Sequence, residues 1–583
     1  MKGNRDERMA ELIVARPVWE PQTIWSLFCE TALRYPKREF LVYEDGRRFT
    51  YADVHEQSLM MQKALVAFGV KPGDVVAFKS ANRPESVMLS LALSGMRAVK
   101  ANLNPGLGAY ELAFVLRQSN TRVLFTDAPV DFEGQDPIDS LASVVTASHE
   151  QLPFTGWAKR VQVTSWAGLL KGSAFPLPGS DGPQSEKALF TREQLPGDKI
   201  AYEVSDIMFT SGSTGNPKGA LLSHDMLLRS AWANCLNRGF EDGRRIFVPL
   251  PLFHVYGYVE GLLAALFVGG TLLMLAHKVP PAQALDFMVH ERAHDVLAVP
   301  SLMLKYLTEL ADCPREFPDL HAVYCSASAA PDSIWPDIRN SFGVDDIITG
   351  YGMTEVSGAS LQTKPGDSDW ILTNRVGAPM PCGPSGMDRY DGLQMEYRLV
   401  DPDSNAICES GAIGELQCRG AIVCYGYCND EEAALKSFTP DGWFKTGDTG
   451  RFDEDGYLEL AGRIKDSYKI NGENVSTRFV ETAMQRFGGI DEVNVVGIPD
   501  VRLGAVGAAF VQFHDDTEER RESFKRYCEA HLARYQVPKY YCFVNADQWP
   551  RTSSGKTKKE VLREWIVDSK VVIPEKASTS KRR

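Results

Sequence analysis

Residues 207–224 read IMFTSGSTGNPKGALLSH, an apolar run that opens into a loop of small, hydroxyl-bearing residues and closes with a second apolar run. Thr210–Gly219 holds three glycines, two serines, two threonines, one proline and one lysine. Glycines permit positive φ and let backbone N–H groups approach an anion closely. Hydroxyl groups add hydrogen-bond donors, and Lys218 adds a point charge. The stretch therefore predicts a cradle for the phosphates of a nucleotide.

Two alternatives for this loop fit less well. The Walker A pattern G-x-x-x-x-G-K-[ST] fails, because Lys218 follows Pro217 and precedes Gly219. Pro217 stiffens the chain and prevents a helix from starting one residue earlier. A flexible Ser/Gly linker would not be flanked so closely by apolar segments.

The whole string closely resembles the signature loop of the AMP-forming adenylating enzymes, which include acyl-CoA synthetases, peptide-synthetase adenylation domains and firefly-type luciferases. The resemblance implies that the loop binds the β- and γ-phosphates of ATP. The residues that it assigns to the nucleotide are Thr210, Ser211, Gly212, Ser213, Thr214, Gly215 and Lys218.

A second motif, GYGMTE at Gly350–Glu355, resembles the Y-G-x-T-E segment of the same family. It follows the apolar pair Ile347-Ile348, and so it lies at a strand end, where α/β sheets place ligands. Alone it would be an ordinary turn. The resemblance implies that the aromatic side chain packs on adenine, the threonine contacts the α-phosphate and the glutamate, a hard oxygen ligand, holds Mg²⁺. These roles fall on Tyr351 with Gly352, on Thr354 and on Glu355.

Two further motifs occur later in the chain. In WFKTGDTG, Asp448 matches the family's T-G-D aspartate, which accepts hydrogen bonds from both ribose hydroxyls. In GRIKD, Arg463 matches the arginine that contacts the nucleotide, and Lys465 matches the hinge. Lys469 and Gly472 then fall on the loop that serves the second half-reaction. Without the other motifs, these segments would be turns and a charged linker.

The fifth motif, PRTSSGKTKK at Pro550–Lys559, matches the family's R-T-x-x-G-K and makes Lys556 the catalytic lysine. A basic stretch near a terminus is most often only solvated. Attack of a carboxylate on the α-phosphorus, however, brings two anions together and builds charge on the transferring group. A positioned cation stabilises that transition state electrostatically.

Two weaker matches concern the acyl group. PLFHVYG resembles the segment whose histidine lines the carboxylate end of the acyl pocket, which makes His254 a candidate catalytic residue. A lone histidine is more often structural. SASAAP at Ser326–Pro331 matches a loop beside adenine and substrate that is usually richer in glycine. A departure from the family pattern is Ala505, where relatives usually carry glutamate. The expected pocket, formed by His254, Ser326–Ala329 and Gly350–Gly358, favours an apolar or aromatic acid.

Composition excludes several classes of function. The 583 residues carry a net charge of −13, which argues against nucleic acid as the main partner. The eleven cysteines show no C-x-x-C pair, which favours a reducing compartment and makes a zinc site improbable. The longest apolar run, residues 261–276, is shorter than a membrane span. No signal peptide or S-K-L address is evident, and we expect a cytoplasmic protein, monomeric or homodimeric.

Alternating strand-like and helix-like runs predict an α/β fold with largely parallel sheets. We expect a large N-terminal domain (1–464) of layered α/β subdomains plus a β-rich subdomain after residue 390. A small mobile α+β C-terminal domain (465–583) would follow. Residues 130–200, rich in Pro, Gly, Ser and Asp, are expected to be connecting structure on the surface.

The five main motifs therefore predict an ATP-dependent carboxylic acid–CoA ligase. Its expected cofactors are ATP, Mg²⁺ and coenzyme A, and its expected substrate is a small-molecule carboxylic acid. Three alternatives remain at this stage. A freestanding adenylation enzyme would load a carrier protein, a luciferase-like oxygenase would consume O₂ with an adenylate, and a non-catalytic protein would only bind the nucleotide.

Overall fold

The structure is a computed structural model. It describes residues 5–127, 130, 132, 135–146, 161–171, 199–210, 217–276, 279–328, 330–470, 473–500, 502–551 and 557–567. The chain divides into two compact units. The first comprises Met1–Tyr397, Cys418–Phe444 and Gly456–Leu458, and the second comprises Arg398–Gln417, Lys445–Asp455 and Glu459–Arg583. Within the described ranges, no helix has the length and hydropathy needed to cross a bilayer.

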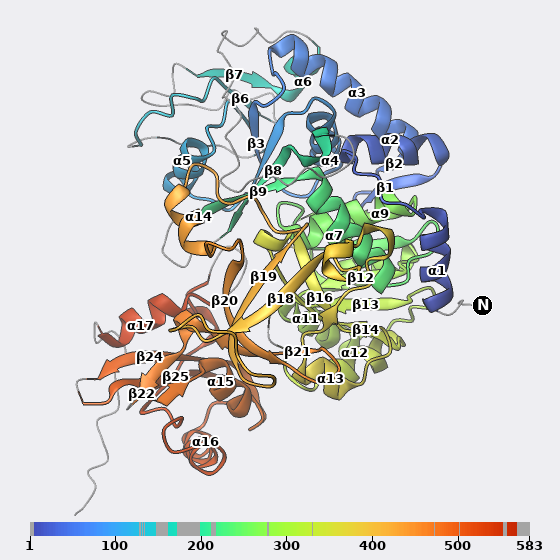
Figure 1. Ribbon diagram of the computed structural model, residues 1–583. Coiled ribbons are helices and arrows are strands. Elements are labelled where there is room, and N and C mark those ends of the chain that lie inside the picture. The colour runs from blue at the N-terminus through green and yellow to red at the C-terminus, as the bar shows by residue number, and fades with distance from the viewer. Residues whose placement is uncertain are drawn as a thin grey trace, which may run out of the picture. The chain divides into compact units, whose positions relative to one another are not determined.

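The first unit contains two seven-stranded sheets (Figure 1). One has the order β14-β13-β12-β10-β11-β1-β2 and is parallel except for β2. Its strands are β1 Glu39–Tyr43, β2 Arg48–Thr50, β10 Arg245–Val248, β11 Thr271–Met274, β12 Asp295–Ala298, β13 Ala322–Cys325 and β14 Asp346–Ile348.

The other sheet has the order β7-β6-β5-β3-β4-β8-β9 and is parallel except for β9. Its strands are β3 Val75–Lys79, β4 Val99–Leu103, β5 Val123–Thr126, β6 Ser143–Thr146, β7 Gln162–Ser165, β8 Val204–Thr210 and β9 Lys218–Ser223.

The prediction of surface connections across residues 130–200 is wrong in part. The strand β6 is buried at all four positions, and β7 and the helix α6 (Trp166–Leu170) follow it. The run SVVT is β-branched and apolar at its centre, so it adds to a parallel sheet although the residues around it are polar.

Helices cover these sheets and share a core with them. Every residue of α7 (His224–Asn237) is buried, and Figure 1 shows this helix between the strands of the two sheets. Side chains of both sheets, such as Met208 and Ile246, belong to the same core cluster. The other helices of the unit are α1 Arg5–Ala15, α2 Ile24–Arg34, α3 Tyr51–Phe68, α4 Pro84–Gly95, α5 Ala109–Gln118, α8 Val255–Gly257, α9 Ala264–Phe267, α10 Pro281–His290, α11 Pro300–Asp312, α12 Ile334–Phe342, α13 Asp369–Asn374 and α14 Glu431–Ser437.

Two smaller sheets follow β14. An antiparallel sheet joins β15 (Gly350–Met353), β16 (Gly358–Gln362) and β17 (Ala378–Pro379). A four-stranded sheet has the order β18-β19-β20-β21. Its strands are β18 Met395–Val400, β19 Gly414–Gly420, β20 Phe444–Phe452 and β21 Leu458–Arg463.

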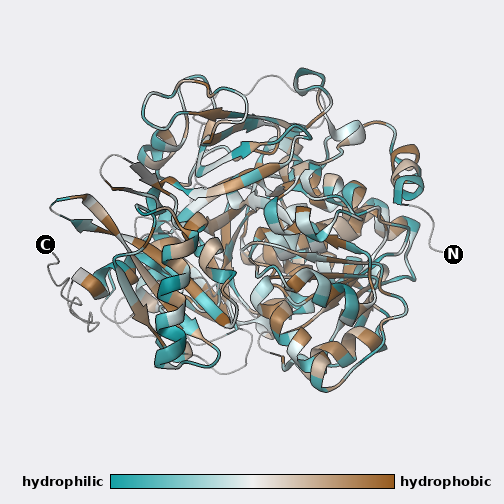
Figure 2. Cartoon of the chain, turned by 90° about the horizontal axis from the view of Figure 1, so that it is seen from below, coloured by the Kyte–Doolittle hydropathy of each residue, from teal (hydrophilic) through white to brown (hydrophobic). Residues whose placement is uncertain are grey.

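The second unit is built on the long antiparallel pair β24 (Ile490–Asp500) and β25 (Gly504–Phe513). Val495 and Ala509 face a core with α15 (Thr477–Gln485) and α16 (Glu518–His531), whereas Val496 and Phe510 face α17 (Lys559–Val567). This period of two is that of a sheet covered on both faces. The remaining strands are β22 Tyr468–Ile470, β23 Glu473–Val475 and β26 Tyr540–Phe543. In Figure 2, hydrophobic and hydrophilic residues alternate along the outer helices, as expected of helices with one buried face.

Candidate functional site

The predicted phosphate loop connects the two strands of an antiparallel hairpin, β8 and β9. Strands β8 and β9 pair in register from Thr210 opposite Lys218, and the Thr210 hydroxyl lies 3.4 Å from the Lys218 carbonyl oxygen. The structure therefore places Thr210 and Lys218 at the two ends of the loop. The other loop residues of the prediction, Ser211, Gly212, Ser213, Thr214 and Gly215, lie outside the described residues.

The second motif forms the edge of the small antiparallel sheet. Gly350–Met353 is strand β15, and a 3₁₀ turn, Thr354–Val356, carries Glu355. The Tyr351 and Thr354 residues are almost buried, at 8% and 6% exposure. A Cβ atom on Gly352 would lie 2.1 Å from the Gly358 carbonyl oxygen, so the close approach of β16 requires glycine at this position.

The segment Cys424–Cys428 joins these two motifs. The Cys424 N–H donates to the Glu355 carbonyl oxygen at 2.8 Å. Three further backbone hydrogen bonds attach the segment to β9: Leu221 N–H to Gly426 O, Tyr425 N–H to Leu221 O and Cys428 N–H to Gly219 O. One short segment thereby fixes the position of the Glu355 turn relative to the strand that begins at Lys218.

Tyr427 lies between the two charged side chains of these motifs. Its hydroxyl donates to Glu355 Oε1 at 2.9 Å, and Lys218 Nζ lies 5.1 Å from the centre of its ring, in cation–π geometry. Burial, together with the nearby Glu355 carboxylate, raises the pKa of Tyr427, which therefore stays a donor. The sequence analysis did not identify Tyr427, because no family motif includes it and its place depends on strand pairing between residues some 200 positions apart.

Two residues of the predicted acyl site lie at the carboxyl ends of strands in the first sheet. His254 follows β10, is exposed and caps the short helix α8, where its Nδ1 accepts the Tyr256 N–H at 3.2 Å. Ser326 follows β13, and its hydroxyl donates to the Gly350 carbonyl oxygen at 2.7 Å. Ala327 adopts a φ of 80°, a region that glycine prefers, whereas Ala329 lies outside the described residues.

In the second unit, Asp448 and Arg463 form an ion pair. Arg463 Nε lies 2.8 Å from Asp448 Oδ1, and the Asp448 residue is 4% exposed. The turn before Asp448 is set by Gly447, at a φ of 69°, and by the Thr446 hydroxyl, which accepts the Asp448 N–H. Asp448 and Arg463, which come from different motifs and are both predicted to contact the nucleotide, therefore lie side by side.

The remaining predicted residues are only partly described. Lys465 Nζ lies 3.6 Å from Glu560, which attaches the predicted hinge to α17. The backbone of Lys469 belongs to β22. Gly472 and the predicted catalytic Lys556 lie outside the described residues. The roles of these residues, and the domain boundary at 464/465, stay predictions.

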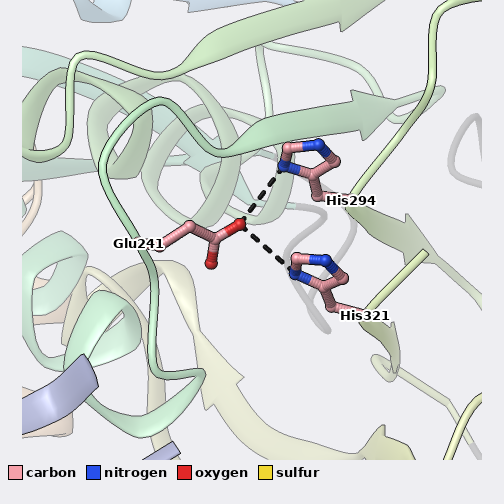
Figure 3. Close-up of side chains that lie close together, drawn as sticks. All are labelled: Glu241, His294 and His321. Carbon is pink, nitrogen blue, oxygen red and sulfur yellow. Dashed lines mark ion pairs between the residues drawn. The ribbon is translucent and has the colours of Figure 1, made fainter. Parts of the chain in front are cut away.

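A cluster of three possible metal ligands lies at the amino-terminal end of the first sheet (Figure 3). Glu241 Oε1 is 3.2 Å from Nδ1 of both His294 and His321. The two rings are stacked at 15°, so their in-plane lone pairs cannot point to one ion, and Arg244 Nη1 lies 2.9 Å from His321 Nδ1. We interpret the cluster as a hydrogen-bond network in which Arg244 donates to His321 Nδ1 and to Glu241 Oε2, while the Arg245 backbone N–H donates to His294 Nδ1. Burial acts to raise the pKa of Glu241, but its interactions with the two nearby histidines and with the charge of Arg244 outweigh this and lower it.

Comparison with known proteins identifies the family. The sequence model of the AMP-binding enzyme family matches residues 28–428, and that of its C-terminal domain matches residues 480–556. The chain belongs to the AMP-binding enzyme family. The prediction of an AMP-forming adenylating enzyme is therefore confirmed, as is the α/β fold with a small second unit.

Two similar sequences belong to named CoA ligases. The mitochondrial medium-chain acyl-CoA ligase of Danio rerio is 28% identical over 542 residues, which cover 92% of this chain and 86% of that one. A Mycobacterium tuberculosis ligase, named for a methyl-dioxo-octahydro-indenyl propanoyl group, is 30% identical over 529 residues, or 91% of this chain and 96% of the ligase. The predicted enzyme class, an AMP-forming acid–CoA ligase, is confirmed by this family membership.

The fold is similar to that of o-succinylbenzoate CoA synthetase from Bacillus subtilis. The structure of that enzyme with its acyl-adenylate intermediate has a TM-score of 0.73 at 25% identity, and covers 93% of this chain and 98% of its own. The same enzyme has been solved with ATP and a magnesium ion, at 24% identity and a TM-score of 0.72 over 92% of this chain and 98% of its own.

Proposed function

We propose that the chain joins a carboxylic acid to coenzyme A in two steps at the expense of ATP. The observation that carries this proposal is the arrangement of Lys218 and Glu355 on either side of Tyr427. A lysine at the end of the predicted phosphate loop and a carboxylate held near it are suited to bind a nucleoside triphosphate with its metal ion.

In the first half-reaction, a carboxylate oxygen of the acid attacks the α-phosphorus of ATP. The new O–P bond forms as the bond to the β-phosphate oxygen breaks, giving an acyl-adenylate and pyrophosphate. By the family resemblance, Lys218 and the Thr210–Gly219 loop hold the β- and γ-phosphates, Thr354 contacts the α-phosphate, and Lys556 stabilises the charge that develops.

Other residues orient the nucleotide. Asp448 accepts the ribose hydroxyls and Arg463 contacts the nucleotide, while Tyr351 and Gly352 lie beside adenine. Glu355 would hold Mg²⁺, because its carboxylate supplies the hard oxygen ligand that this ion prefers. The bound ion would neutralise charge on the phosphate oxygens.

In the second half-reaction, the thiol of CoA attacks the carbonyl carbon of the adenylate, and AMP leaves with the shared oxygen. The resemblance assigns the loop with Lys469 and Gly472 to this step, after rotation about Lys465. The relatives are named CoA ligases, which favours CoA over a carrier-protein thiol as the acceptor. His254 would lie at the carboxylate end of the acyl pocket.

Replacement of Lys556 by alanine tests the first half-reaction. We expect pyrophosphate release from ATP and a panel of carboxylic acids to fall by about 10²–10³. Thioester formation from a supplied acyl-adenylate and CoA should be retained, because that step does not use the lysine. Lys558→Ala serves as the matched control. Undiminished pyrophosphate release in the Lys556→Ala variant would contradict the assignment, and absence of release by the unmodified chain with every acid would contradict the function.

A further inference from the structure

Glu260 is a buried carboxyl group on the segment that begins at His254. The helix α8 continues into a π-helix, Tyr258–Leu263, which contains Glu260. π-helical turns are rare and are frequent at functional sites. His254 is exposed, whereas Glu260 is 1% exposed, so the segment runs inward from the predicted carboxylate end of the acyl site.

The two oxygens of this carboxyl group differ in their contacts. Oε1 accepts the Ala359 N–H at 2.6 Å. Oε2 is buried and has no hydrogen-bond partner among the residues that the structure describes. The Arg238 guanidinium donates to the Glu260 backbone carbonyl, and its charge is paired with Asp295, so it does not neutralise the carboxyl group.

The environment favours the neutral carboxylic acid. Burial raises the pKa of Glu260 to about 8, although the Ala359 N–H and the charge of Arg238 act in the opposite direction. At neutral pH the group is therefore mainly protonated. Its Oε1 is satisfied, which leaves the O–H of Oε2 as a donor. A buried donor without an acceptor is costly, so the group gains from any ligand that supplies an oxygen.

Glu260 lies against the predicted acyl lining. A Cβ atom on Gly358 would be 2.7 Å from Glu260 Oε1, and Gly358 ends the stretch Gly350–Gly358. Glu260 lies six positions after His254, on a segment that is α-helical at Val255–Gly257 and π-helical from Tyr258, so the carboxyl group lies more than one helical turn beyond His254. A polar group of the chain therefore lies at a depth that the distal part of an acyl chain would reach.

We propose that Glu260 selects acids whose chain carries a neutral oxygen, a ketone or a hydroxyl, at a position remote from the carboxylate. The inference rests on the proposed ligase function and narrows its substrate class. It also changes the expectation of an apolar or aromatic acid, because the lining on which that expectation rested did not include Glu260.

The test compares octanoate with a series of oxo-octanoates in which the ketone moves along the chain. The readout is kcat/KM for acid-dependent pyrophosphate release at pH 7. For the unmodified enzyme we expect one ketone position near the distal end to be preferred over octanoate by about three- to tenfold, the effect of one neutral hydrogen bond. Glu260→Leu should remove or reverse this preference. Glu260→Gln should keep it, because the amide N–H donates to the same ketone.

Glu241→Gln, at a second partly buried glutamate, is the matched control and should leave the ranking of acids unchanged. Because the readout is a ratio between two acids, a loss of folded protein in Glu260→Leu would not alter it. An identical ranking in the unmodified enzyme, Glu260→Gln and Glu260→Leu would overturn this inference while leaving the ligase function intact. No turnover of any acid would overturn both.

Discussion

The two ends of the first seven-stranded sheet differ in how their polar groups are used. At the amino-terminal end, charged groups are paired with one another. Arg244 Nη2 lies 2.9 Å from Asp295 Oδ2, its Nη1 lies 2.7 Å from Glu241 Oε2, and Arg238 also binds Asp295. At the carboxyl-terminal end, β10, β13 and β14 lead into the segments of His254, Ser326 and Gly350, where side chains suited to ligands collect.

Within this sheet, the residues that stabilise the fold and the residues predicted to bind substrates lie at opposite ends of the strands. At the strand starts, ion pairs between charged side chains hold the strands together. The segments at the strand ends are held by backbone hydrogen bonds and carry carboxylate, hydroxyl and imidazole groups of the kind that bind substrates. Substitutions at the two ends should therefore change different measurements.

The largest expected effect is at the amino-terminal end. Asp295→Ala should lower the free energy of unfolding by about 3–5 kcal/mol, because the buried Arg238 would lose its carboxylate partner and the buried Arg244 would keep only Glu241. Urea unfolding measures this change. The kcat of the folded fraction should be unchanged. Asp319→Asn, whose partner Arg292 is exposed, is the control and should have little effect on stability.

At the carboxyl-terminal end, Glu355→Gln should reverse this pattern. Pyrophosphate release should fall by about 100-fold, because the proposed metal ligand loses its charge. Stability should hardly change, since the amide oxygen can still accept from the Tyr427 hydroxyl. A variant with normal activity and a lowered urea midpoint would show that Glu355 has a structural role instead.

The pH dependence of stability should differ in sign between two glutamates. The pKa of Glu241 is lowered below the ordinary 4.5, so its contribution to stability is present above pH 4.5 and is lost on acidification. The pKa of Glu260 is raised to about 8, so its contribution is fully present below pH 4.5 and is lost between pH 4.5 and 8, by up to about 1.4 kcal/mol per pH unit. Glu241→Gln should flatten the stability curve below pH 4.5, and Glu260→Gln should flatten it between pH 4.5 and 8. Parallel curves for both variants would refute the contrast.

The smallest effect should come from Tyr427→Phe. The ring below Lys218 remains, but the hydroxyl that orients Glu355 is lost. We expect kcat/KM for ATP to fall by about three- to tenfold, with partial recovery at high Mg²⁺ concentration. Tyr425→Phe is the control in the same segment, because its hydroxyl donates to the Tyr202 carbonyl oxygen instead. Equal losses in both variants would indicate a general effect of the segment.

Much of the site could be predicted from the sequence because the motifs are local strings. Thr210, Lys218 and Glu355 lie in segments whose chemistry is visible in consecutive residues. Tyr427 and Glu260 could not be found in this way, since their roles depend on contacts with strands β9 and β16, which are distant in the sequence. The strand β6 was missed for a related reason: its four residues are too few to show periodicity, and only their neighbours in the sheet make them a strand.

The attachment of Cys424–Cys428 to β9 has a consequence for biosynthesis. Strand β9 is at the edge of its sheet, and the segment that completes its hydrogen bonds is made about 200 residues later. At about 5–20 residues per second, a ribosome needs roughly 10–40 s to reach it. Throughout this interval the nascent chain exposes an unpaired strand edge, which is a surface for aggregation and for chaperones. The predicted nucleotide site can therefore form only after most of the first unit of the chain has been synthesised.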